Sequence, residues 1–476
     1  MGESSSRCRP AEEHTLGTMA EDIDHLDILG EQPALFKLYT QICSVYTMGD
    51  DSATAREHVC TILRNGLNSV AQSFPWLAGI IVNEGASMGV TGRSRIVRTD
   101  TIPLVVKDLR RREGAPTLDA MRKAGFPLAM LDEHLVAPCM TLNLPGTSTG
   151  LVSDEGGPVF AVQATFIAGG LLLTVVGQHN AMDMMGQANV MRLLCKACSG
   201  EDFSDEELDI GNADKSRCVK LLDDSWQPGN ELDRQLVKPA VRSSLPPAHS
   251  TWAYVTFSPE SQRLLKVEAT STMPPTSAFV STDDAICAFI WKCVSRARLS
   301  YLDGDTDSTF ARAIDARKYV KVPGTYPGAL MNMVYNSNTL AALASAPLGE
   351  IAAQLRGKLQ DEAGIAHNTR ALATYLGRCA DKSVVSITAC VDAHSGVLLS
   401  SWAKVGTILY ELEFGLGLGQ PLVVRRPRFA AMESLMYIMP KAPGEAELAV
   451  AMCVSDADWR RLHEDECWRR HIVHVG

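Results

Sequence analysis

The residues with the clearest chemical potential are His179 and Asp183, which stand four positions apart within the segment 177–186. An imidazole has a near-neutral pKa, so it can accept a proton from an alcohol at physiological pH, as acyl transfer to oxygen requires. The same spacing also arises by chance, and a histidine satisfied by local hydrogen bonds is the competing interpretation. A metal site would need further ligands, which the sequence does not supply, so we expect no metal.

The surrounding sequence predicts how His179 and Asp183 are positioned. Apolar and polar residues alternate over 162–166, glycines follow at 169–170, and 171–176 is continuously apolar, a pattern typical of a β-hairpin that leads into a buried strand. Val190, Leu193, Leu194 and Ala197 then mark a helix. The sequence therefore places His179 at a strand-to-helix junction.

A second segment of interest is the glycine-rich stretch that starts at Glu413 and includes Gly415 and Gly417. A phosphate-binding loop would need a strand before it and a helix after it, whereas Pro427 and an apolar strand at 437–439 follow here. We interpret the stretch as a structural loop held by the acidic residue. The pair Cys195 and Cys198 lies within the predicted helix after His179 and lacks a second cysteine pair, so metal or redox work there is disfavoured.

Composition limits the class of protein. The 476 residues are 46% hydrophobic and 21% charged with a net charge of -10, which fits a folded globular chain of two or three domains and disfavours nucleic acid as a partner. The 13 scattered cysteines suit reduced thiols, and we find neither a secretory signal nor an 18-residue apolar run. We therefore expect a cytoplasmic protein that does not bind membranes.

Helical and strand patterns occur in both parts of the chain, which predicts a mixed α/β class. Residues 201–250 are rich in Asp, Glu, Ser, Asn and Pro, so we expect a linker there. The predicted organisation is a loose tail at 1–22, a first domain at 23–200, the linker at 201–250 and a second domain at 251–476.

Four segments in this order resemble the motifs of the BAHD acyltransferases. His179 and Asp183 match the His-x-x-x-Asp motif, and 413–417 is similar to the Asp-Phe-Gly-x-Gly motif. The segments 281–298 and 315–332 are similar to the helix that opens the second domain and to the Asp-x-Arg region. Within this family, segments such as 121–127 and 401–406 resemble the fungal trichothecene 3-O-acetyltransferases, and the likeness runs from about Ile23 to Gly476. Three departures are Glu413 in place of Asp, Asn180 in place of Gly, and the extra tail before Ile23.

The resemblance implies an α/β fold of two similar chloramphenicol-acetyltransferase-like domains with mixed β-sheets and an active-site channel between them. It implies a monomer that uses acetyl-CoA to acetylate a small-molecule terpenoid alcohol, the 3-hydroxyl of a trichothecene-type sesquiterpenoid, by direct transfer in a ternary complex. An acyltransferase of the same fold acting on another fungal alcohol or amine, and an inactive terpenoid-binding relative, are the alternatives.

The resemblance also implies roles for individual residues. His179 is expected to act as general base, and Asp183 to pair with Arg317 and so hold the loop that orients the imidazole. Arg317, Glu413, Gly415 and Gly417 are the expected structural residues. The residues expected to contact coenzyme A are Ser281, Thr282, Ser400, Ser401 and Trp402.

Overall fold

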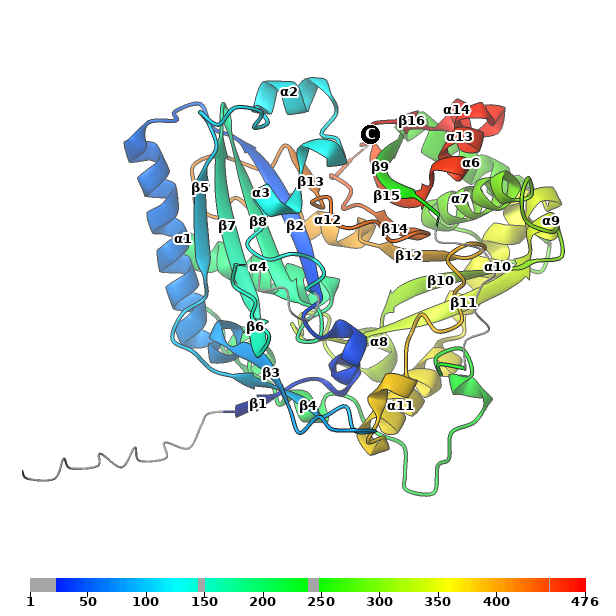
Figure 1. The fold of residues 1–476 in the computed structure, drawn as a ribbon, viewed down its shortest axis with the longest axis horizontal. Coiled ribbons are helices and arrows are strands. Elements are labelled where there is room, and N and C mark those ends of the chain that lie inside the picture. Colours follow the sequence, from blue (N-terminus) through cyan, green and yellow to red (C-terminus); the bar gives the residue numbers. More distant parts are fainter. Residues whose placement is uncertain (1–22, 144–149, 239–247, 445) are drawn as a thin grey trace, which may run out of the picture.

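The computed structural model describes residues 23–143, 150–238, 248–444 and 446–476. Two halves lie side by side, each built on a large β-sheet with helices packed against it (Figure 1). Helices and strands mix in both halves, as expected from the sequence. The predicted tail at 1–22 and residues 239–247 of the predicted linker lie outside the described residues.

The first half contains a five-stranded sheet and a smaller four-stranded sheet. The order of the large sheet is β13 (Val423–Arg425), β2 (Tyr39–Thr47), β8 (Gly170–Gln178), β7 (Phe160–Ile167) and β5 (Leu104–Asp108). The smaller sheet has the order β1 (Ile23–His25), β4 (Arg93–Val97), β3 (Ile80–Glu84) and β6 (Gly156–Pro158). The predicted hairpin is confirmed: β7 and β8 pair antiparallel around Gly169, whose φ of +82° suits glycine.

One face of the large first sheet packs on α1 (Ala53–Ser73) and α4 (Met184–Cys198). Alternate residues of β7 and β8 point to these helices, and Leu63 and Leu194 are among the helical side chains buried against them. Side chains of α2 (Leu118–Lys123) and α3 (Glu133–Val136) are among those that cover the opposite face. This sheet is therefore buried on both sides, which explains why 171–176 is apolar except for the buried Thr174.

The second half contains a seven-stranded mixed sheet. Its order is β11 (Met331–Thr339), β10 (Asp307–Asp315), β12 (Val397–Ser401), β14 (Leu435–Ile438), β15 (Leu448–Ser455), β9 (Ser250–Phe257) and β16 (Val473–His474). The remaining α-helices are α5 (Asp205–Gly211), α6 (Pro259–Ser271), α7 (Thr282–Arg298), α8 (Arg317–Val320), α9 (Leu340–Ser345), α10 (Leu348–Gln360), α11 (Glu362–Arg378), α12 (Gly406–Leu409), α13 (Asp456–Glu464) and α14 (Glu466–His471). Short 3₁₀ turns lie at Ile28–Glu31, Pro33–Leu35, Pro75–Ala78, Leu128–Met130, Lys215–Arg217, Asn230–Leu232, Lys382–Val384 and Ala403–Val405.

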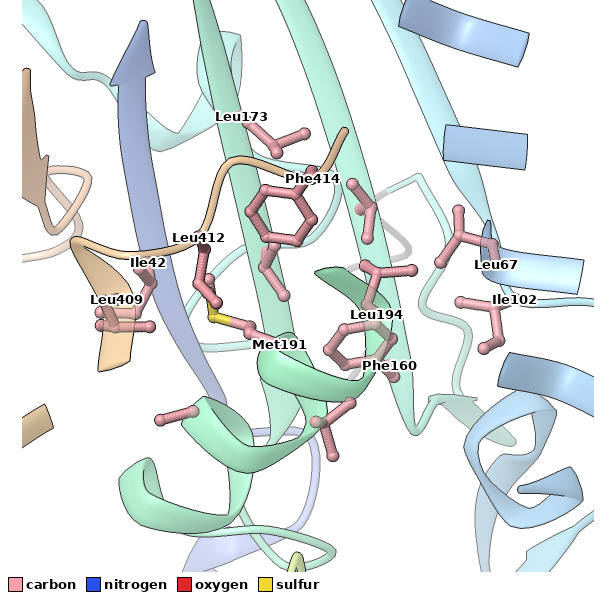
Figure 2. Close-up of a cluster of buried hydrophobic side chains, with 14 of the residues drawn as sticks. Ile42, Leu67, Ile102, Phe160, Leu173, Met191, Leu194, Leu409, Leu412 and Phe414 are labelled. Carbon is pink, nitrogen blue, oxygen red and sulfur yellow. The ribbon is translucent and has the colours of Figure 1, made fainter. Parts of the chain in front are cut away.

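The chain returns to the first half after β12. Strand β13 pairs antiparallel with β2, so a segment of the sequence-predicted second domain completes the first sheet. Figure 2 shows Leu409, Leu412 and Phe414, which precede β13, packed in one cluster with Ile42 of β2 and Met191 of α4. Side chains that follow β12 therefore pack into the core of the first half. The division at 201–250 remains a prediction.

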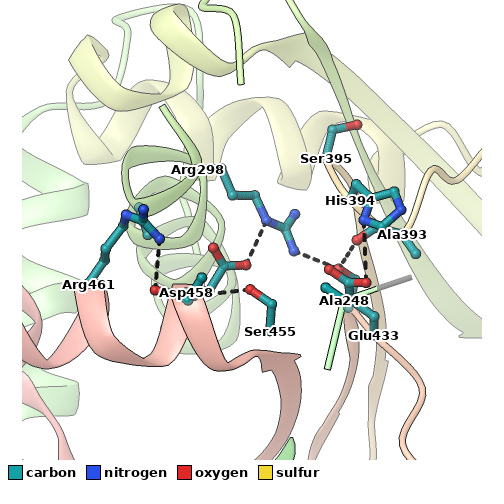
Figure 3. A network of polar contacts seen from close by, with 12 residues as sticks. Ala248, Arg298, Ala393, His394, Ser395, Glu433, Ser455, Asp458 and Arg461 are labelled. Atoms are coloured by element: carbon teal, nitrogen blue, oxygen red, sulfur yellow. Dashed lines mark hydrogen bonds and ion pairs between the residues drawn. The ribbon is translucent and has the colours of Figure 1, made fainter. Parts of the chain in front are cut away.

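A buried ion pair joins α7 to α13 in the second half. Arg298 of α7 donates from Nε to Asp458 of α13 at 3.2 Å, and both side chains are fully buried (Figure 3). Ser455 caps α13 by accepting from the Asp458 amide, and the Asp458 carboxylate binds Arg298 and Tyr301, so it does not close a capping box. Within the described ranges, no helix has the length and apolar character needed to cross a bilayer.

Candidate active site

His179 lies directly after β8, and Asp183 is the N-cap of α4, so both residues occupy the strand-to-helix junction predicted from the sequence. The His179 amide donates to the Leu38 carbonyl at 2.7 Å, which fixes the backbone at this point. The Asp183 carboxylate accepts from the Gly186 amide at 2.8 Å, which caps the helix. Between them, the Asn180 side chain is fully buried and neither atom of its amide group has a hydrogen-bond partner.

The imidazole of His179 is held in one tautomer. Its Nδ1 lies 3.3 Å from the carbonyl oxygen of Met182, and because a carbonyl can only accept, Nδ1 must carry the proton. Nε2 then carries the lone pair, and no hydrogen bond to it is found in the described part of the chain. Burial lowers the pKa of His179, and the nearby charge of Arg426 lowers it further, against the opposing effect of Asp183. A neutral, half-buried imidazole with a free Nε2 is suited to accept a proton.

Asp183 points into a buried ion pair with Arg317, as predicted. Nη1 of Arg317 donates to Oδ2 at 2.8 Å and Nη2 to Oδ1 at 3.0 Å, and both side chains are buried. The Leu330 amide also donates to this carboxylate at 2.8 Å. Arg317 further donates to the carbonyls of Tyr326 and Gly328. Apart from the cap on α4, the hydrogen bonds of Asp183 therefore join the two halves beside His179, and none of them goes to the imidazole.

The Asp183–Arg317 pair brings together residues far apart in the sequence. Asp183 belongs to the first half, whereas Arg317 begins α8 in the second half. Two-point pairing fixes the orientation of both groups better than a single contact does. The junction that carries His179 is therefore held by the second half as well as by its own strand.

Arg426 was not singled out as a site residue from the sequence, yet its charge acts on His179. Its guanidinium lies 4.2 Å from the ring centroid of Phe429, 4.7 Å from that of Tyr437 and 5.7 Å from that of Trp402. Nη2 donates to Thr141 Oγ1 at 3.2 Å, and the buried Nε has no hydrogen-bond partner. In the part of the chain that the structure describes, no carboxylate lies within 4.0 Å of this guanidinium. The guanidinium is therefore buried without a close ion pair among these residues, and its charge also acts on the buried Glu133 carboxylate.

A short path of contacts connects Arg426 to His179. Thr141, which accepts from Arg426, also receives the Tyr39 amide on its carbonyl at 2.9 Å. The preceding residue, Leu38, holds the His179 amide. In the sequence, Arg426 stands in the basic stretch 425–428, which is followed by aromatic residues such as Phe429. Nothing in that pattern indicates that one guanidinium turns inward.

The predicted coenzyme A residues are gathered in one region. Ser281 caps α7 by exchanging hydrogen bonds with Asp284, and Thr282 is the first residue of that helix. Ser401 at the end of β12 donates to Asp283 at 2.9 Å, which joins β12 to the start of α7. The structure therefore brings the two predicted segments together.

The hydroxyl and indole groups of the second segment also contact each other. The indole Nε1 of Trp402 donates to Ser400 Oγ at 2.9 Å, and the ring lies 4.6 Å from Tyr437. Trp402 is buried in the core cluster that includes Ala181 and Met182. The 3₁₀ turn that follows, Ala403–Val405, contacts α4, so the chain after β12 passes close to the helix that Asp183 caps.

The loop at 413–417 is held by Phe414 and not by the acidic residue Glu413, as had been expected. Glu413 is exposed, and no ion pair to it is found among the described residues, so the expected acidic anchor is wrong. The loop is anchored by the fully buried Phe414 ring and by its amide, which donates to Cys195 Sγ at 3.2 Å. Phe414, Gly415 and Gly417 have φ of +51°, +60° and +70°. At Gly415 a Cβ would lie 2.9 Å from the Cys198 carbonyl oxygen, whereas Gly417 has open space.

Comparisons with known proteins agree with this architecture. A family model described as the trichothecene 3-O-acetyltransferase-like N-terminal domain matches residues 38–198, and a model of the transferase family matches residues 145–467. The chain is 50% identical over 460 residues to a trichothecene 3-O-acetyltransferase of Saccharomyces cerevisiae, covering 95% of this chain and 96% of that one. It is 44% identical to the O-acetyltransferase dmxR13 of Cryptosporiopsis sp., covering 96% and 98%.

A solved structure is similar over almost the whole chain. F. graminearum TRI101 complexed with coenzyme A and deoxynivalenol superimposes with a TM-score of 0.90 at 45% identity, covering 95% of this chain and all of that one. The fold and the site define an O-acyltransferase of the acyl-CoA-dependent class, which confirms the predicted α/β class and the resemblance. The chain belongs to the transferase family, in the group with the trichothecene 3-O-acetyltransferase-like N-terminal domain.

Proposed function

We propose that this protein transfers the acetyl group of acetyl-CoA to a hydroxyl of a trichothecene-type sesquiterpenoid, with the 3-hydroxyl as acceptor. The observation that carries the proposal is the state of His179, whose Nδ1 is committed to Met182 and whose Nε2 has no hydrogen-bond partner among the described residues. The names of the relatives and the ligands of the similar solved structure support the donor and the acceptor.

In the proposed reaction, Nε2 of His179 takes the proton of the acceptor hydroxyl as its oxygen attacks the thioester carbonyl. The tetrahedral intermediate collapses, the carbon–sulfur bond breaks, and the imidazolium returns its proton to the sulfur of coenzyme A. No covalent enzyme intermediate is needed, so both substrates must be bound together. The lowered pKa of His179 keeps the imidazole neutral before each turnover.

The proposed role of Asp183 is to position His179. Its carboxylate is fully occupied by Arg317, by the Leu330 amide and by the N-terminus of α4. A carboxylate used in this way stabilises the junction, and it acts on the imidazole only through its charge and not through a hydrogen bond. This role differs from that of the aspartate in a Ser-His-Asp triad, which bonds the imidazole directly.

The proposed role of Arg426 is electrostatic. A positive charge fixed near the reacting atoms favours the negative charge that develops on the carbonyl oxygen in the transition state. The aromatic rings of Phe429, Tyr437 and Trp402 hold the guanidinium in place without neutralising it. The residues Ser281, Thr282, Ser400, Ser401 and Trp402 remain the proposed contacts for coenzyme A.

A second candidate acceptor is an alcohol or amine of a different fungal metabolite. The 44% identity to the O-acetyltransferase dmxR13 favours this alternative, because that relative is named without a trichothecene. The same catalytic histidine would serve either acceptor. The difference would lie in the shape of the acceptor pocket.

The experiment is incubation of the full chain with acetyl-CoA and a panel of trichothecenes, unrelated terpenoid alcohols and amines, followed by thiol release and mass detection of products. We expect an ester on trichothecenes with a free 3-hydroxyl and none when that hydroxyl is blocked. Acetylation of the other alcohols or amines alone would favour the second candidate. Substrate binding without thiol release would indicate an inactive relative.

A further inference from the structure

Two cysteines far apart in the sequence lie close together where α14 packs beside α7 in the second half. Cys293 lies in the middle of α7 and is buried in the core cluster of that half, and Cys467 of α14 packs against the same cluster. Both thiols are free. Neither residue is among those proposed for acyl transfer or for contact with coenzyme A.

Arg296 connects the two cysteines. Its Nη2 donates to Cys293 Sγ at 3.5 Å, and its Nε donates to Asp465 at 2.7 Å. The other oxygen of Asp465 accepts from the Cys467 amide at 2.8 Å. The guanidinium therefore fixes α14 beside α7, with the two thiols in the same small region.

The two thiols differ in exposure and in acidity. Cys293 is 1% exposed, whereas Cys467 is only partly buried. Hydrogen bonds from the Cys293 thiol and from Arg296 lower the pKa of Cys467 to about 6, against the opposing effects of burial and of Asp465. Burial raises the pKa of Cys293. Lys292 adds a second positive charge near the pair.

This combination is unusual within the chain. Among the described cysteines, each of the others with a resolved shift has its pKa raised, with burial as the largest cause. Reactive cysteines are accessible thiolates in electropositive surroundings, and redox-sensing ones commonly have a second thiol beside them. Cys467 meets the first description, and Cys293 is the second thiol beside it.

We propose that Cys467 and Cys293 form a peroxide-reactive site that closes to a reversible disulfide between α14 and α7. The Cys467 thiolate attacks hydrogen peroxide, which breaks the O–O bond, gives a sulfenic acid on Cys467 and releases hydroxide. The Cys293 sulfur then attacks the sulfenic sulfur, the S–O bond breaks, and the disulfide and water form. Peroxide is reduced and the two thiols are oxidised. A dithiol reductant restores the starting state.

The first test uses the unmodified full chain. It is treated with stepwise additions of hydrogen peroxide, alkylated after denaturation, and digested for mass spectrometry. We expect a Cys293–Cys467 cross-linked peptide to appear before any other cysteine is oxidised, and to disappear with dithiothreitol. Oxidation of Cys467 without this cross-link, or earlier oxidation of another cysteine, overturns the proposal.

The second test measures the rate of alkylation of the native protein by iodoacetamide as a function of pH. We expect the alkylation rate at Cys467 to be half-maximal near pH 6. At pH 7, the rate at Cys467 should exceed the rate at the partly buried Cys390 several-fold. A half-maximal rate above pH 8 at Cys467 overturns the proposal. This readout needs no substitution, so it does not depend on how a variant folds.

Variants then separate the two roles. Cys293→Ser should leave a sulfenic acid on Cys467 that dimedone traps, and Cys467→Ser should protect Cys293 from peroxide. Cys390→Ser is the matched control and should cross-link as the unmodified chain does. Equal oxidation of Cys293 in the Cys467→Ser variant contradicts the assigned order of attack.

Discussion

The carboxylate of Asp183, at the start of α4, forms a two-point ion pair with the guanidinium of Arg317, at the start of α8, at 2.8 and 3.0 Å. The pair is buried and joins the two halves of the molecule directly beside His179. The position of the proposed base therefore depends on a contact between segments 134 residues apart.

Asp183→Ala should cost both stability and activity. Removal of the carboxylate leaves the Arg317 charge buried without its main partner, a change that destabilises by about 3–5 kcal/mol. Urea unfolding of the full chain measures this loss. The matched control is Asp315→Asn, because Asp315 also binds Arg317 but is 40% exposed and should cost much less. Loss of activity in Asp183→Ala with unchanged stability would contradict the positioning role.

Arg426→Met should change the pH dependence of acetyl transfer. His179 acts in its neutral form, so kcat/KM rises as the pH increases through the pKa of His179. The charge of Arg426 lowers that pKa, and its removal should therefore move the rising limb to higher pH. Arg426→Lys keeps the charge and should leave the limb near that of the unmodified chain. If both variants shift the limb equally, the electrostatic role of Arg426 is wrong.

Phe414→Ala should destabilise the chain far more than Glu413→Gln. The Phe414 ring is fully buried among residues of β8 and α4, and truncation of such a ring costs about 3–5 kcal/mol. Glu413 is exposed without an ion pair among the described residues, so its change should stay within about 0.5 kcal/mol. Thermal unfolding of both variants distinguishes the apolar anchor from an acidic one.

Much of the local structure near His179 could be predicted from the sequence. The alternation in β7, the apolar run of β8 and the period of α4 depend on neighbouring residues, and these patterns placed His179 at the junction correctly. The Asp183–Arg317 pair came from the resemblance, since no local pattern relates the two residues.

Contacts between segments far apart in the chain could not be predicted from the sequence. The inward turn of Arg426 depends on three aromatic rings from separate segments. The return of β13 to the first sheet depends on pairing with β2, almost 400 residues earlier in the chain. The acidic anchor at Glu413 failed because a buried phenylalanine next to it holds the loop instead.

The central claim is that His179 is the base, and turnover of His179→Ala tests it most directly. Acetyl transfer is measured as ester formation from acetyl-CoA and a trichothecene, with His367→Ala, an exposed histidine of α11, as the matched control. We predict a loss of about 10²- to 10⁴-fold in kcat for His179→Ala with unchanged unfolding, and normal turnover for the control. Near-normal turnover of the correctly folded His179→Ala variant would contradict the account.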